Sequence, residues 1–209
     1  MASDSSDIMS IQIEGLVKSA SRLEAVLNFG GASAGIVVLA KLLGGSDFEI
    51  WGLKVKLVWT WIPFAALTIA HLYGALLFIR RAYGLFVAGD TSRSKAWEKL
   101  TSGGLLWFDG FIARREARKL PLGFVVYRMS LGDPTTWLAH GVALGFFVAI
   151  FDWQNANWTM RLATGLAGGV ILVVNWLIGT NWAVAASELA LSDASQSRYF
   201  LWLKGICVR

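Results

Sequence analysis

The sequence predicts an all-α integral membrane protein, built as a four-helix transmembrane bundle with amphipathic interfacial helices around it. Of its 209 residues, 56% are hydrophobic and only 16% are charged, which is outside the usual range for a soluble domain. Eleven tryptophans and twelve phenylalanines point the same way, because aromatic rings favour the boundary between hydrocarbon and headgroups. The single cysteine, Cys207, excludes an internal disulfide and a cluster of thiolate metal ligands.

Four stretches are apolar enough to be membrane spans. They cover residues 25–43, 57–79, 134–150 and 162–186. A helix rises about 1.5 Å per residue, so about 20 residues cross a hydrocarbon layer of about 30 Å. The second stretch is the clearest, because it has no formal charge until Arg80 and Arg81 follow it. The third begins with Asp133 and Pro134, which are favoured at a helix cap and at the first helical position.

The segments outside the spans are predicted to include amphipathic helices at the membrane surface. The N-terminal segment, residues 1–24, mixes apolar and charged residues at helical spacing, and the C-terminal tail, residues 188–209, is too short for a fifth span. The transmembrane domain covers residues 25–187 and includes a basic loop, residues 80–133. In this loop four basic residues follow an aromatic stretch and are expected to bind anionic lipid headgroups: Arg114, Arg115, Arg118 and Lys119.

The distribution of basic residues predicts the orientation in the membrane. Ten of the nineteen Lys and Arg residues lie in residues 80–133, whereas residues 44–56 and 152–161 hold few. The positive-inside bias therefore places the basic loop, and with it both termini, in the cytoplasm. The expected location is a bacterial inner membrane or the inner membrane of an organelle. Nucleic acid is not an expected partner, because basic clusters beside a membrane are more often topology signals.

Small residues within the spans indicate where helices pack. Gly31 and Gly35 are four residues apart, as are Gly165 and Gly169, and this spacing lets two helix backbones approach closely. The alternative for the first pair is a flexible hinge. We expect these glycines to pack the helices of one chain together or to join the chain to a second copy or to other subunits.

The only two histidines, His71 and His140, both lie within predicted spans. An ionisable side chain inside a bilayer needs a partner that offsets its desolvation. One interpretation is a cofactor site, in which both imidazoles bind b-type haem or one binds chlorophyll, and another is a proton-responsive gate. We favour a third, in which each neutral histidine hydrogen-bonds a hydroxyl or carbonyl group on a neighbouring helix, because no haem motif accompanies the pair.

Two asparagines, Asn175 and Asn181, are predicted to lie within the last span. They are six residues apart and therefore point about 120° away from each other around the helix, so they do not form one site alone. An asparagine in a span usually joins helices, as we expect for Asn175. In an oligomer, a ring of such amides, or of His71, is also able to line an aqueous path.

Catalytic motifs are absent from the sequence. It has no glycine-rich phosphate loop, no pair of histidines four residues apart and no nucleophile elbow. We therefore expect a non-enzymatic multi-pass membrane protein that self-associates or joins a larger complex, either as a pore or channel or as a structural subunit. The alternative is an electron-transfer or antenna subunit that holds haem or chlorophyll at His71 and His140.

Overall fold

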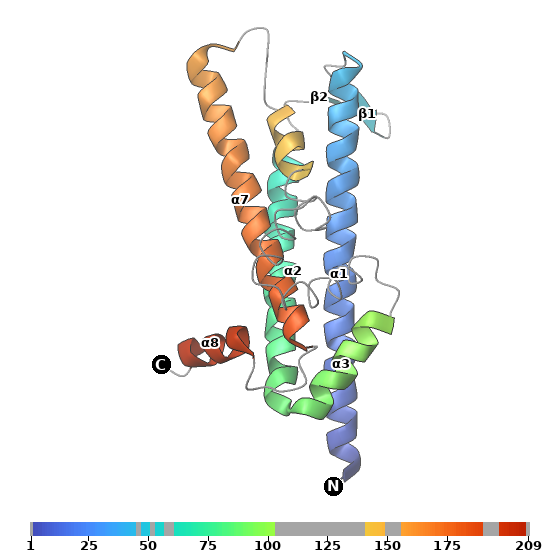
Figure 1. Ribbon diagram of the computed structural model, residues 1–209. Coiled ribbons are helices and arrows are strands. Elements are labelled where there is room, and N and C mark those ends of the chain that lie inside the picture. The colour runs from blue at the N-terminus through green and yellow to red at the C-terminus, as the bar shows by residue number, and fades with distance from the viewer. Residues whose placement is uncertain are drawn as a thin grey trace.

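The computed structural model describes residues 2–44, 47–50, 53–56, 61–102, 141–148, 156–189 and 197–207, and these are mainly helical (Figure 1). The helices are α1 (Ala2–Leu42), α2 (Trp61–Ala88), α3 (Asp90–Ser102), α7 (Trp158–Leu189) and α8 (Arg198–Cys207). Residues 141–148 form a further helical segment. Strands β1 (Asp47–Ile50) and β2 (Leu53–Lys56) pair as an antiparallel hairpin. The long helix α2 packs against α1 and against α7, so three long apolar helices are shown, whereas the predicted four-helix bundle stays a prediction.

Helix α1 is continuous over 41 residues, and it passes without a break through the predicted boundary between residues 24 and 25. The position of the N-terminal half at a lipid surface stays a prediction, and the structure adds that its side chains Leu16, Ala20 and Leu23 are fully buried. This half packs against α2 and α3. Close approach to α2 is helped by Gly74, where an added Cβ would lie 3.0 Å from Leu23 Cδ2. These three side chains therefore contact protein, whereas Ile8 and Ile11 are exposed.

Helix α2 contains most of the predicted span 57–79 and continues beyond the arginine pair that was expected to end it. Arg80 and Arg81 are followed by two more turns, whose Ala82 and Leu85 are fully buried. The helix ends at Gly89, whose φ of 114° is a conformation that other residues rarely adopt. The chain then enters α3, a short helix on the predicted basic loop.

The last predicted span, residues 162–186, lies entirely within α7. Asn157 caps the start of this helix, where its side-chain oxygen accepts a hydrogen bond from the Met160 amide at 2.9 Å. Of the third predicted span, 134–150, the structure describes residues 141–148, which are helical as expected. Its remaining residues lie outside the described part of the chain, as do the predicted headgroup-binding residues: Arg114, Arg115, Arg118 and Lys119.

The two ends of the bundle differ. The hairpin β1–β2 lies at the end where α1 finishes, within a segment that the sequence analysis treated as a loop (Figure 1). Helices α3 and α8 lie toward the opposite end, and α8 lies crosswise to the long helices and extends away from them. The predicted C-terminal tail is thus helical over Arg198–Cys207, and its position at a membrane surface stays a prediction.

Candidate functional site

A cluster of hydrogen-bonded polar side chains lies in the bundle interior, where α2 contacts α7. It consists of Thr68 and His71 from α2 and Asn175 and Trp182 from α7. His71 and Asn175 are each 1% exposed, and Trp182 is fully buried. Their spacing explains how they meet, because residues three apart on α2 and seven apart on α7 share one side of a helix. We call these four residues the interior polar cluster.

Both ring nitrogens of His71 have partners in the cluster. The indole Nε1 of Trp182 lies 3.1 Å from His71 Nε2, and the side-chain oxygen of Asn175 lies 3.1 Å from His71 Nδ1. An indole N–H can only donate, so Nε2 must accept and the proton must be on Nδ1, which donates to Asn175. The hydrogen bonds therefore select a neutral imidazole with one defined tautomer.

Asn175 connects this histidine to the rest of α2. Its amide nitrogen donates to the Thr68 hydroxyl at 3.0 Å and to the Ile171 carbonyl of its own helix at 3.0 Å. The Thr68 hydroxyl donates in turn to the Phe64 carbonyl at 3.0 Å. Each N–H group of the Asn175 amide thus has an acceptor, and the amide joins α2 to α7 in the low-dielectric interior.

The arrangement suits a helix clamp better than a ligand site. Trp182 also packs edge-on against Phe78, with ring centroids 6.1 Å apart and an interplanar angle of 75°.

A metal or haem iron would need the lone pair of His71 Nε2, which the Trp182 N–H already occupies. His140 lies outside the described residues, so its pairing with His71 stays a prediction. Among the described residues, no group of three or more His, Cys, Asp or Glu side chains could hold a metal ion.

The glycines predicted to pack helices are not in close contacts within the described part of the chain. At Gly31, Gly35, Gly165 and Gly169, an added Cβ would meet no atom within 4 Å. The first two line an apolar groove of about 530 Å³ between α1 and residues 141–148, together with Leu27, Asn28, Ala34, Val38, Leu39, Leu42, Gly141 and Leu144. We call this the α1 groove.

The close helix contacts use other glycines, which the sequence analysis did not single out. At Gly145, an added Cβ would lie 2.6 Å from the Phe64 ring and 3.2 Å from the Ala34 backbone. At Gly168, it would contact Ala143 and Phe147 at 3.8 Å. Spacing offered one usable signal, because Gly168, Asn175 and Trp182 recur every seven residues and so lie on one side of α7.

A second polar contact lies where α7 meets α8. The Ser197 hydroxyl donates to the Glu188 carboxylate, which is only 3% exposed, and accepts from the Phe200 amide at 3.2 Å. Ser197 therefore caps the start of α8, where a carboxylate is also favoured by the helix dipole. Burial, and then the nearby Glu188 carboxylate, raise the pKa of Tyr199. These contacts determine where α8 leaves the bundle.

A buried arginine stabilises the junction of α2 with α3. Arg93 is 1% exposed, and its guanidinium lies 3.0 Å from the carboxylate of Asp90, one turn earlier. Its Cζ also lies 5.7 Å from the centre of the Phe86 ring, a cation–π distance. Arg93 was expected to contribute to the positive charge of the basic loop, and the structure adds a packing role.

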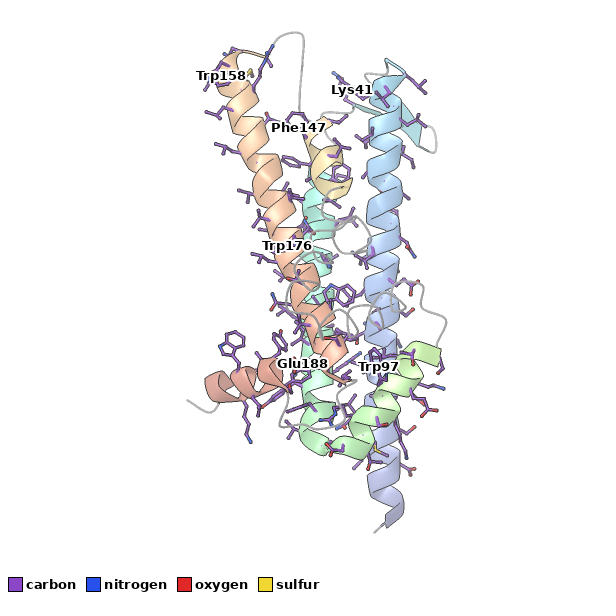
Figure 2. The ribbon with its side chains drawn as sticks, viewed as in Figure 1. Lys41, Trp97, Phe147, Trp158, Trp176 and Glu188 are labelled. Carbon is purple, nitrogen blue, oxygen red and sulfur yellow. The ribbon has the colours of Figure 1, made fainter. Side chains whose placement is uncertain are left out.

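Three helices in the described part of the chain are long and apolar enough to cross a membrane: Asp7–Leu42, Ile62–Ala88 and Trp158–Leu189. Their length and composition suggest the class of helical integral membrane proteins. Figure 2 shows the last of them extending from Trp158 at its upper end to Glu188 near its lower end. Comparison with protein-family models, curated proteins and solved structures gives no match.

Proposed function

We propose that this chain is a non-enzymatic multi-pass membrane protein that associates with a second copy of itself and serves as a structural subunit of a membrane assembly. The α1 groove carries the proposal, because Gly31 and Gly35 leave room there for another helix backbone. Within a bilayer, apolar side chains gain no hydrophobic free energy by leaving lipid tails for another helix, because both surroundings are apolar. Helix association there depends instead on van der Waals packing, which requires close approach. An approaching helix would gain van der Waals contacts along the whole groove.

The outer side of α7 supports the same proposal. Gly165 and Gly169 are exposed there, and no atom of the described residues would lie within 4 Å of an added Cβ. Asn181 is exposed further along this helix, where its amide donates to the Leu177 carbonyl of its own turn at 2.8 Å. A polar amide on an apolar helix gains from packing against another helix, because lipid tails offer no hydrogen bonds.

A structural subunit has more support than a pore. The polar atoms of the interior polar cluster hydrogen-bond one another, whereas the wall of an aqueous path presents polar atoms to water.

The haem or chlorophyll alternative has less support as well, because a ligand at His71 Nε2 would have to displace Trp182. An absorption spectrum of the purified protein tests it: a Soret or chlorophyll band that disappears in His71→Ala would replace our proposal.

Self-association is measurable through the single cysteine. One sample of the protein is labelled at Cys207 with a donor fluorophore and another with an acceptor, and the two are mixed in phosphatidylcholine vesicles. Energy transfer between copies is then measured as the protein is diluted with lipid. We expect Gly31→Leu combined with Gly35→Leu to raise the dissociation constant at least tenfold, or about 1.4 kcal/mol. The control is Gly84→Leu, a glycine on α2 with equally open surroundings. A monomeric wild-type protein, or equal association of both variants, would contradict the proposal.

We also propose that both termini are cytoplasmic, in a bacterial inner membrane or the inner membrane of an organelle. Support comes from the lower end of the bundle, where α3 and α8 carry basic residues near the arginine pair of α2: Arg93, Lys95, Lys99 and Lys204. A membrane-impermeant maleimide should label Cys207 only after lysis. Labelling in intact cells would reverse the orientation.

A further inference from the structure

A second groove runs along the contact between α1 and α2. Its lower part has a volume of about 500 Å³ and is lined by Ile11, Gln12, Gly15, Leu77, Arg80, Arg81 and Gly84. Its upper part has a volume of about 310 Å³ and is lined by Ser19, Arg22, Ala25, Val26, Ala70, Tyr73, Gly74 and Leu77. Leu77 borders both parts, so they follow one another along the two helices. We call them together the α1–α2 groove.

The charges that line this groove are all positive. Arg80 and Arg81 border the lower part and Arg22 borders the upper part, and among the described lining residues there is no acidic side chain. The guanidinium of Arg81 donates a hydrogen bond to the Gly15 carbonyl across the groove, which holds it in place. An added Cβ at Gly15 would lie 3.7 Å from the Arg81 guanidinium, which is an ordinary contact distance, so the two groups pack closely here. An anion at the lower part would therefore meet one positioned arginine, Arg81, beside the exposed Arg80.

The upper part is apolar and lies further into the predicted span of α2. Nearly all of its lining surface is carbon, and small residues such as Ala25, Ala70 and Gly74 leave its floor open. The arginine pair comes directly after the uncharged stretch of α2, where hydrocarbon gives way to headgroups. The groove thus has the arginine pair at headgroup depth and, apart from Arg22 at its border, a mainly apolar upper part at the depth of acyl chains.

We propose that the α1–α2 groove binds an anionic phospholipid. The phosphate pairs with Arg80 and Arg81, as expected for charge-assisted bonds between guanidinium and phosphate groups. One acyl chain follows the apolar upper part past Leu77. A free phosphate ion would use only the lower part, so the shape and chemistry of the whole groove favour a lipid. This site lies on a different part of α1 from Gly31 and Gly35 and is independent of self-association.

Native mass spectrometry of the monomer, released from micelles, tests the charge requirement. The probes are phosphatidylglycerol and phosphatidylcholine of identical acyl chains. We expect the wild-type protein to prefer phosphatidylglycerol, and Arg80→Gln with Arg81→Gln to lose about fivefold in affinity for each arginine removed, equivalent to about 1 kcal/mol each. The matched control is Lys95→Gln with Lys99→Gln, which removes two exposed charges from α3.

Arg81 also bonds the Gly15 carbonyl of α1, so its removal could change the fold as well as the charge. Arg80→Gln alone keeps this hydrogen bond, because Arg80 is exposed and does not take part in it. It should lose about fivefold in affinity while its thermal unfolding midpoint stays at the wild-type value. Equal binding of both lipids by the wild-type protein, or equal losses in the α3 control, would overturn the proposal.

A second pair of variants tests the apolar end. Ala25→Phe fills the upper part without a change of charge, whereas Ala32→Phe adds the same ring to another exposed site on α1 outside the groove. We expect Ala25→Phe alone to weaken phosphatidylglycerol binding, and inorganic phosphate to compete poorly. Undiminished binding by Ala25→Phe, or full competition by inorganic phosphate at equal concentration, would identify a simple anion site and overturn the lipid assignment.

Discussion

The two sides of α7 carry the same kinds of residue in different surroundings. Gly168 and Asn175 are buried on the inner side, whereas Gly165, Gly169 and Asn181 are exposed on the remaining, outer surface of the helix, with Asn181 on a different face from the two glycines. Asn175 joins α7 to α2 through His71 and Thr68, whereas the amide of Asn181 bonds back to its own helix. Gly168 admits residues 141–148, whereas the outer glycines have open space around them. A glycine or an asparagine in a span therefore acquires its role from what lies opposite it.

The comparison also separates what stabilises one chain from what is free to join chains. On the inner side, substitutions should lower the free energy of unfolding, because side chains there fill space and complete hydrogen bonds. On the outer side, the same substitutions should leave folding unchanged and act only on association. Four matched pairs of variants probe this difference.

Replacing Trp182 by alanine should have the largest effect. This fully buried ring packs on Phe78 and donates to His71, so Trp182→Ala leaves a cavity and an unpaired nitrogen. We expect a loss of about 3 kcal/mol in the free energy of unfolding, measured by denaturant titration in micelles. Trp158→Ala, at a position 77% exposed, should change it by less than about 0.5 kcal/mol. Comparable losses would mean that the interior polar cluster is not a clamp.

The asparagine pair gives the next effect. Asn175→Leu keeps the approximate volume but leaves the Nδ1 proton of His71 without its acceptor, at a cost of about 2 kcal/mol. Asn181→Leu removes only a bond to its own helix, so folding of the single chain should be unaffected or slightly more stable. Unfolding in micelles again provides the measurement. Equal changes in both variants would contradict the assignment of the two sides.

Two adjacent glycines offer a finer test. Leucine at Gly168 would be forced against Ala143 and Phe147, so Gly168→Leu should cost about 1.5 kcal/mol. Gly168→Ala should be tolerated, because its Cβ would make ordinary contacts at 3.8 Å. Gly169→Leu should leave the thermal midpoint near that of the wild-type protein. If Gly169→Leu destabilised the monomer as much as Gly168→Leu, the outer side of α7 would have to be covered within the chain.

The sequence alone predicted the helices well because hydrophobic length is a property of each segment by itself. Residues 162–186 and most of 57–79 lie in helices, as expected. The extent of α1 was harder, since the charges of its N-terminal half suggested a surface helix, although no proline or glycine interrupts it near residue 24. Its side chains Leu16, Ala20 and Leu23 are buried where this half packs against α2 and α3, and no local pattern encodes that contact.

The interior polar cluster was only partly predictable. A partner for His71 was expected from the cost of an ionisable group in a bilayer, and Asn175 was expected to bond a neighbouring helix. The structure shows that His71 and Asn175 bond each other and that Trp182 bonds Nε2 of His71. These contacts depend on how α2 and α7 are aligned along their axes, which the sequence does not state. The packing role of the glycine pairs stays a prediction for a related reason. Spacing identifies a side of a helix on which a close approach is feasible, and it does not say whether the neighbour belongs to the same chain.

The smallest expected effect belongs to the outer side of α7, and it decides whether that side has a partner. Gly165→Leu combined with Gly169→Leu adds bulk where the described part of the chain has open space, so the unfolding free energy in micelles should stay within about 0.5 kcal/mol. Energy transfer between Cys207 labels should fall, with association about fivefold weaker, or about 1 kcal/mol. Gly84→Leu is again the control. Unchanged association would leave the α1 groove alone as the contact between copies, because an outer side that tolerates two leucines in the assembly must face lipid.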